Sequence, residues 1–331
     1  MKLSGYHVLN PLIRAKELEL LRPDFFEKLM EAADIEEVGE LLKPTSYGSL
    51  IQPGFEHTFN EAMDQEQANL FDWLVEIAPE KEVVWVYTMR FTFHNLKVLT
   101  KGEKLEQDLD HLFVPDGFYS IQQLKEVIRS GESEQLPTEI VASVQEVLAY
   151  LQESAILQGI DVIYDRHFLQ TQRAVGERLE YPELLNEITH FIDLTNIILL
   201  VRGLYQKRSH GFMHSVLSDA GDIPKEELLE FVGGELPAFK EFLRNSVYRD
   251  ELSVILQEET LDPAALERFK DNYLTDLYQT AQTQAFGPLP LLAFLNAKEV
   301  ERKNLQLIVT AKRSKIAKER IRERMRNAYD L

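Results

Sequence analysis

The sequence of 331 residues contains no cysteine, and glycine (15) and proline (13) are scarce. The absence of cysteine excludes disulfides, thiolate metal sites and a thiol nucleophile. Glycine and proline both disturb helix interiors, so their scarcity favours long helices over many short strands. An apolar fraction of 44% is large enough to bury a core, and 27% charged residues are typical of a folded chain.

A long uninterrupted apolar run is also missing. Residues 1–10 contain no secretory signal, and the apolar run at 196–201 is bounded by Asp193 and Arg202. A membrane-spanning helix needs about 20 apolar residues, so we predict no direct membrane span. The expected location is cytoplasmic, and any work at a membrane would be done through another protein.

The charge is strongly acidic and unevenly spread. The formal net charge is −19, which disfavours nucleic acid as a partner because phosphate backbones would be repelled. Residues 298–331 nevertheless carry 11 Lys and Arg against 5 Asp and Glu, a net charge of +6. The remaining residues therefore carry −25, and this polarity between body and tail suggests a docking role for the tail.

One short pattern recurs three times along the chain. The segments FHNLKVLTKG, LTNIILLVRG and RKNLQLIVTAK each place an apolar run and a basic residue after an asparagine: Asn95, Asn196 and Asn304. Each asparagine lies on or beside the apolar face of a predicted helix. Either a structural hydrogen bond is repeated by duplication, or three equivalent amides face a shared axis and line a polar cavity. The sequence leaves both interpretations open.

A second pattern precedes each copy and marks a helix start. A helix-start residue is followed three positions later by Glu or Gln and then by apolar residues at helical spacing. The pairs are Asp34 with Glu37, Ser120 with Gln123, and Pro224 with Glu227. We therefore predict an all-α fold of three degenerate helical repeats of about 100 residues. The expected boundaries are 1–105, 106–210 and 211–331.

Motifs for catalysis and metal binding are weak. His210 and His214 have the spacing of a helical zinc pair, but Gly211 follows the first histidine and we expect a loop there. The sequence has no phosphate-binding G-x-x-x-x-G-K-[ST] loop. The neighbours Asp165, Arg166 and His167, and the pair His190 and Asp193, lack any sign of a shared pocket. We predict no catalytic residues, no metal and no cofactor.

The basic tail is the most informative segment. Ala317, Ile321, Met325 and Ala328 form an apolar stripe, so we predict a basic amphipathic helix that packs by one side. Its exposed face is interpreted as a solvated surface, a membrane-surface helix or a docking face for an acidic protein, of which we favour the last. The candidate partner-binding residues are Arg313, Lys315, Lys318, Arg320, Arg322, Arg324 and Arg326.

The segment from Gly287 to Val309 resembles the signature of the C subunit of the prokaryotic V/A-type ATPase, whose eukaryotic relative is the d subunit of the V-ATPase. The resemblance centres on a proline turn, an apolar run and the stretch from Lys298 to Leu305, and it continues into the basic end. The opening residues 5–21 are similar too, although Asn10-Pro11-Leu12 departs from the usual Asn-Ala-Arg pattern. The resemblance covers essentially the whole chain.

The resemblance implies a funnel of three helical bundles around a pseudo-threefold axis. Such a subunit is a non-catalytic adaptor, present once per complex, that joins the central shaft to the membrane ring of proteolipid subunits. It would transmit torque for H⁺ or Na⁺ transport from the cytoplasmic face of the membrane. The alternatives are a helical-repeat scaffold for soluble partners and a metal-dependent hydrolase that uses His210 and His214.

Overall fold

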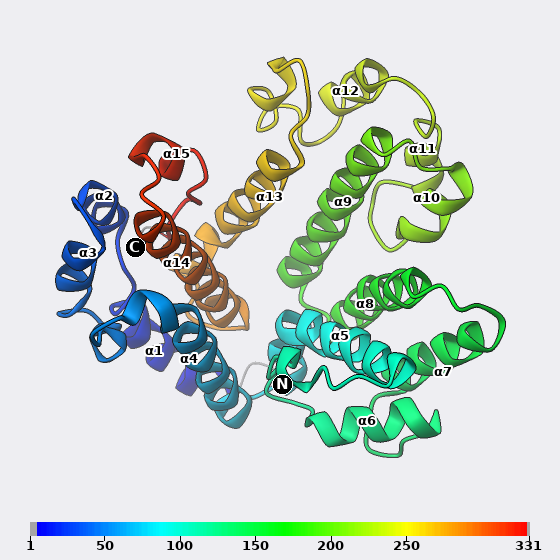
Figure 1. Cartoon of the computed structure of the whole chain (residues 1–331), viewed down its shortest axis with the longest axis horizontal. Helices are drawn as coiled ribbons and strands as arrows, with labels where there is room; N and C mark the ends of the chain where they lie inside the picture. Colours follow the sequence, from blue (N-terminus) through cyan, green and yellow to red (C-terminus); the bar gives the residue numbers. More distant parts are fainter. Residues whose placement is uncertain (1–4, 330–331) are drawn as a thin grey trace. The chain divides into compact units, whose positions relative to one another are not determined.

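A computed structural model describes residues 5–329, which form fifteen α-helices and no strand (Figure 1). The predicted all-α fold is therefore confirmed. The α-helices are α1 (Tyr6–Glu17), α2 (Pro23–Glu31), α3 (Ile35–Leu42), α4 (Phe55–Ile77), α5 (Lys81–Leu105), α6 (Ile121–Ser130), α7 (Thr138–Glu153), α8 (Gln158–Leu179), α9 (Pro182–Tyr205), α10 (His210–Val216), α11 (Lys225–Leu229), α12 (Leu236–Arg244), α13 (Pro263–Leu277), α14 (Leu289–Arg313) and α15 (Lys318–Arg322). Short 3₁₀ helices are η1 (Gly48–Leu50), η2 (Asp110–Leu112), η3 (Ile255–Gln257) and η4 (Tyr278–Thr283).

The chain forms two compact units. Unit 1 combines Met1–Glu80 with Ala264–Leu331, and unit 2 is the continuous segment Lys81–Pro263. The first of these boundaries lies just before α5, at the end of a linker that follows α4. The three repeats with boundaries at 105/106 and 210/211 stay a prediction at the level of domains.

Unit 1 is organised around α14, which packs against α1, α2, α3 and α4. The helix begins at Leu289 with Pro290 in its first turn, a position that lacks an intrahelical partner for its N–H in any case. Its apolar side chains Leu305, Ile308 and Val309 join a core formed with α2, α3 and α4. The N-terminal and C-terminal parts of the chain thus share one hydrophobic core.

Unit 2 is built around α8, which packs against α5, α7 and α9. α5 is continuous from Lys81 to Leu105, with buried residues through Gly102. By length and composition, α9 is apolar enough to cross a membrane, which the interrupted apolar run did not predict. However, 61% of its apolar window is buried, as in the central helix of a protein core.

The helix starts follow the predicted signals in part. Ser120 forms a complete capping box with Gln123 at the start of α6. Asp34 accepts from the Glu37 N–H, while the Glu37 carboxylate accepts from Ala33 rather than from Asp34 itself. Pro224 precedes α11 and lacks a capping side chain.

Candidate functional site

The three asparagines occupy equivalent places in α5, α9 and α14. All three side chains are fully buried. In each case the side-chain amide donates to the carbonyl and accepts from the N–H of one and the same backbone residue, about twenty positions further on. The pairs are Asn95 with Val114 (2.7 and 2.8 Å), Asn196 with Ser218 (2.8 and 2.9 Å) and Asn304 with Arg326 (3.0 and 3.0 Å). Both functions of each buried amide are satisfied by backbone, which corresponds to the structural interpretation of the repeated asparagine.

The same three helices also end alike. Eleven residues after each asparagine, a charged residue takes a left-handed backbone conformation, with φ of 53° at Glu106, 50° at Lys207 and 55° at Lys315. The next N–H then donates to the carbonyl seven residues after the asparagine, at Gly102, Gly203 and Ala311. A Cβ at Gly203 would lie 2.5 Å from the sulfur of Met213, so a larger residue there would displace the end of the Met213 side chain. The repeat therefore includes a turn that the sequence did not reveal, because glycine does not mark it.

A buried polar side chain three residues before each asparagine holds the segment that enters the next short helix. Asp193 accepts from the Ile223 N–H (3.0 Å) just before α11. Thr92 donates to Asp116, whose carboxylate accepts from the N–H groups of Phe118 (2.8 Å) and Tyr119 (3.0 Å) before α6.

The third copy takes this segment from the other end of the chain. Glu301 of α14 is buried, and its carboxylate accepts from the N–H of Leu21, just before α2. The counterpart of α6 and α11 in this contact is thus α2, whereas the sequence pattern had paired them with α3 at Asp34. The N-terminal segment completes the third copy within unit 1.

The carboxylate of Glu301 has two further partners. Lys298 donates to it at 2.8 Å and also to the Tyr47 hydroxyl at 2.6 Å, and Tyr47 itself donates to Glu301. Burial raises the pKa of Tyr47, and the neighbouring Glu301 carboxylate raises it further. This buried cluster joins α14 to the loop before η1, so Glu301 and Lys298 stabilise the packing of unit 1.

A second charged cluster on α14 holds the C-terminal tail. Asp271 of α13 accepts from Lys303 (3.1 Å) and from Arg326 (2.5 Å). Burial alone would raise the pKa of Asp271, but the two cations outweigh it and the pKa is lowered. Together with the Asn304 hydrogen bonds, this ion-pair cluster fixes the tail at Arg326.

The prediction of one continuous basic amphipathic helix in the tail is wrong. α14 ends at Arg313, the chain turns at Lys315, and α15 covers only Lys318–Arg322. The turn allows the tail to reverse and bury Ile321 in the core beside α2. The predicted packing by one side is correct for Ile321, although the helix around it is short.

The seven candidate cations divide into two groups. Four contact unit 1 itself: Arg313 donates to the Glu56 carbonyl (3.0 Å), Lys318 pairs with Glu31 (3.3 Å), Arg322 pairs with Glu27, and Arg326 pairs with Asp271. Lys315, Arg320 and Arg324 are exposed, and their side chains form no hydrogen bond or ion pair with any residue between 5 and 329. The sequence could not separate the two groups, because Glu27, Glu31 and Asp271 are far from the tail along the chain.

The remaining residues that the sequence suggested for metal binding or catalysis do not come together in one site. His210 and His214 lie on α10 and not in a loop, because Ser209 caps a helix there. Within the described part of the chain, no group of three or more His, Asp or Glu side chains is placed to hold a metal ion. Asp165 pairs with Lys97, and Arg166 and His167 both contact Glu146.

The second acid–histidine pair lies on α9. His190 is hydrogen-bonded to the Tyr248 hydroxyl at 2.8 Å, and Asp193 binds the loop before α11. Burial lowers the pKa of His190 and raises that of Asp193 to about 6. These contacts hold polypeptide segments together.

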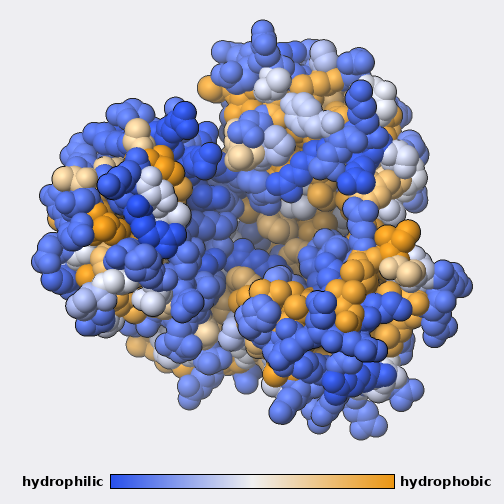
Figure 2. Space-filling view, in the orientation of Figure 1, coloured by the Kyte–Doolittle hydropathy of each residue, from blue (hydrophilic) through white to orange (hydrophobic). Residues whose placement is uncertain are grey.

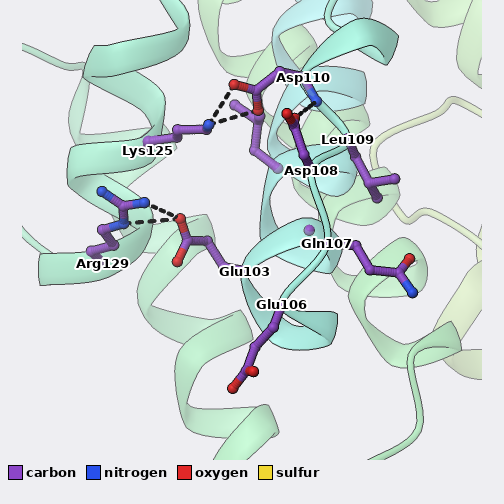
Figure 3. A pocket seen from close by; sticks show the side chains of 10 residues that line it. Glu103, Glu106, Gln107, Asp108, Leu109, Asp110, Lys125 and Arg129 are labelled. Atoms are coloured by element: carbon purple, nitrogen blue, oxygen red, sulfur yellow. Dashed lines mark hydrogen bonds and ion pairs between the residues drawn. The ribbon is translucent and has the colours of Figure 1, made fainter.

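A charged pocket of about 290 Å³ lies at the end of α5 (Figure 3). Two of its carboxylates are in ion pairs, Glu103 with Arg129 (2.5 Å) and Asp110 with Lys125 (2.6 Å). Glu106 extends away from these pairs in Figure 3. The pairs tie α5 and η2 to α6 at the turn that follows Gly102.

Comparison with known proteins identifies the family. A sequence model described as ATP synthase (C/AC39) subunit matches residues 9–324. The C subunit of the V-type sodium ATPase of Enterococcus hirae is 54% identical over 326 residues, which cover 98% of this chain and 99% of that protein. The C subunit of the A-type ATP synthase of Methanocaldococcus jannaschii is 23% identical and covers 97% and 86% of the two chains. That of Methanothermobacter thermautotrophicus is 24% identical, with 92% and 83% covered. The chain is a member of the ATP synthase (C/AC39) subunit family, the C subunits of the V/A-type rotary ATPases.

Proposed function

We propose that this subunit is a non-catalytic adaptor that joins the central shaft of a rotary ATPase to the proteolipid ring in the membrane. ATP hydrolysis in other subunits turns the shaft, the adaptor turns with it, and the ring moves H⁺ or Na⁺. One copy serves each complex, peripheral on the cytoplasmic face of the membrane. The relationship to a V-type sodium ATPase subunit over nearly the full chain supports this role.

We propose that the exposed cations of the tail, Lys315, Arg320 and Arg324, form the partner-binding surface. The observation that supports this assignment is the division of the tail cations into paired and unpaired side chains. Arg322 and Arg326 bind carboxylates of unit 1 and fix the tail, so the neighbouring cations are held on an anchored segment. Lys315, Arg320 and Arg324 remain exposed and uncompensated. A fixed group of positive charges on an acidic protein favours an acidic partner surface and sets its orientation more than its affinity.

Charge reversal of the exposed cations tests this partner-binding surface. In the assembled complex, Arg320→Glu with Arg324→Glu should leave ATP hydrolysis running while ATP-driven ion transport is lost. Because neither side chain has an internal partner, circular dichroism and the melting temperature of the free subunit should not change. Hydrolysis and ion uptake are measured on the same reconstituted vesicles.

The matched control is Lys104→Glu with Lys207→Glu, which makes the same charge change at two exposed cations of unit 2 that form no ion pair with a described residue. This control should couple normally. Normal coupling of hydrolysis to ion transport in the Arg320 and Arg324 double variant would contradict the assignment of the tail to the interface.

The adaptor role itself is tested by affinity isolation of the tagged subunit from gently solubilised membranes. Recovery of shaft and proteolipid subunits with one copy of this chain is the expected result. Recovery of soluble, unrelated proteins alone would favour the scaffold alternative. Stoichiometric zinc or iron in the pure protein would favour the hydrolase alternative at His210 and His214.

A further inference from the structure

The third copy of the repeat is made from both ends of the chain with the same spacing as the continuous copies. In the first two copies, the backbone partner of the asparagine is followed five positions later by an N–H that a buried carboxylate accepts. These residues are Val114 with Tyr119 and Ser218 with Ile223. A helix begins two residues after that N–H in both copies, and α2 likewise begins at Pro23, two residues after Leu21. Leu21 therefore takes the place that a continuous chain would reach five residues after Arg326.

This correspondence assigns the helices to three sets. Each set begins with its asparagine helix and ends before the next one. The sets are α5–α8 (residues 81–181), α9–α13 (182–288), and α14 and α15 with α2–α4 (289–329 and 18–80). We call the third set the split repeat. Among the helices between residues 5 and 329, α1 alone has no counterpart in the other sets.

The buried face of α1 binds the link that enters the split repeat at α14. Asn10 donates to the carbonyls of Ala285 (3.0 Å) and Gly287 (3.2 Å), which lie between η4 and α14. Arg14, one turn further along the same face, donates to the Gln284 carbonyl (3.3 Å). Three backbone carbonyls of this link thus have side-chain partners on α1.

The start of α1 lies against the link that leaves the split repeat. Tyr6 donates to the Glu80 carboxylate (3.2 Å), and a Cβ added to Gly5 would lie 2.4 Å from the Pro79 side chain. Pro79 and Glu80 connect α4 to α5, where the chain passes from unit 1 into unit 2. One helix outside the repeats therefore contacts both links of the split repeat.

The outward face of α1 does not contribute to these contacts. Val8 is 61% exposed and Leu12 is 49% exposed. Figure 2 shows hydrophobic residues scattered among hydrophilic ones on the visible face of the unit that contains α1–α4 and α14, which is ordinary for a protein surface. The role of α1 is therefore argued from its buried face alone.

We propose that α1 is a clasp on the split repeat, a single helix that orders the link into α14 and the link out of α4, so that both links are held and released together. Segments near a chain end open at a lower free energy than the core does, so the clasp can loosen while the repeats stay folded. The proposal is independent of the adaptor role, because every contact that carries it lies within unit 1.

The absence of cysteine allows each link to carry a single nitroxide label. Phe286→Cys places the label between the two carbonyls that accept from Asn10, and Lys81→Cys places it directly after Glu80. In the full-length subunit, Ile13→Ala removes a buried contact of α1 and should raise the mobile fraction of the spectrum at both labels by at least about twofold. Asn10→Ala should mobilise only the label at 286, because Asn10 contacts only that link.

The matched control is Leu305→Ala, a truncation at an equally buried position in the core that α14 forms with α2, α3 and α4. It should leave both labels as they are in the wild-type background. Unchanged spectra in Ile13→Ala, or an equal rise in Leu305→Ala, would overturn the clasp. If Ile13→Ala does not fold, Asn10→Ala with the label at 286 and Tyr6→Phe with the label at 81 decide in the same way, since each removes polar contacts to one link.

Discussion

Three buried asparagines each form the same pair of hydrogen bonds with the backbone of one residue further along the chain. An amide that is buried without partners costs about 1–3 kcal/mol, so each position needs its backbone pair. The sequence identified Asn95, Asn196 and Asn304 as equivalent from the apolar run that follows each one. It could not identify Val114, Ser218 and Arg326 as the partners, because these residues share no side-chain chemistry and only their backbone takes part.

The buried Asp193 carboxyl predicts a pH dependence of stability. Burial raises its pKa to about 6 from an ordinary value of 3.8, so the folded state holds a proton that the unfolded chain releases. Its contribution to stability is complete below about pH 4 and is lost as the pH rises through 6. Asp193→Asn keeps an acceptor for Ile223 and removes the titration.

We therefore compare the free energies of unfolding of Asp193→Asn and wild type by urea unfolding at pH 4.5 and pH 7.5. The difference between variant and wild type should shift by about 1–2 kcal/mol in favour of the variant from the lower to the higher pH. Asp222 and Tyr248 act on this carboxyl, and His190 binds Tyr248 beside it; all three remain in both proteins. Asp64→Asn, at an exposed surface position, should track wild type at both pH values. A constant difference between Asp193→Asn and wild type would refute the titration.

At the scale of elements, α14 connects more segments than any pattern in the sequence indicated. Its apolar run and helical period were predictable, as were its approximate start and the tail's packing through Ile321. The break at Lys315 was not, because a lysine in a left-handed turn carries no signal that separates it from a lysine inside a helix. The tail cations looked equivalent for the same reason, since their partners lie in α2 and α13.

The ion-pair cluster at Asp271 predicts how the tail is held. Asp271→Asn removes the charge that pairs with Lys303 and Arg326 at a mostly buried position. Breaking one side of a buried cluster leaves uncompensated cations, so we expect a loss of about 2–3 kcal/mol in the free energy of unfolding. Amide exchange at residues 318–327 should become faster.

Asp64→Asn serves as the matched control, because Asp64 forms an exposed pair with Arg302 (3.0 Å). Exposed pairs contribute about 0–1 kcal/mol, so this variant should retain slow exchange in the tail. Equal effects of the two substitutions would mean that the Asp271 cluster does not hold the tail.

At the scale of the whole molecule, the repeats and the compact units divide the chain differently. The predicted repeats are consecutive in sequence, whereas unit 1 joins the first 80 residues to those after 263. Glu301 gives the local reason, because it takes its backbone partner from Leu21 instead of from a following segment. A search for repeats detects consecutive copies, so it could find the three asparagines but not the exchange of segments between the chain ends.

This exchange has a consequence for synthesis on the ribosome. Chains emerge from the N-terminus and domains generally fold as units, so residues 21–31 are made long before the α14 surface that receives them exists. Unit 2 is continuous and should become protease-resistant while the nascent chain is still attached. Pulse proteolysis of stalled nascent chains ending near residue 300 and of released full-length protein measures the order: unit 2 should be protected in both and unit 1 only after release. Early protection of unit 1 would contradict it. Until α14 is made, α2 and α3 have only α4 to pack against, and the cell must keep their apolar faces from other proteins for the time needed to translate the rest of the chain.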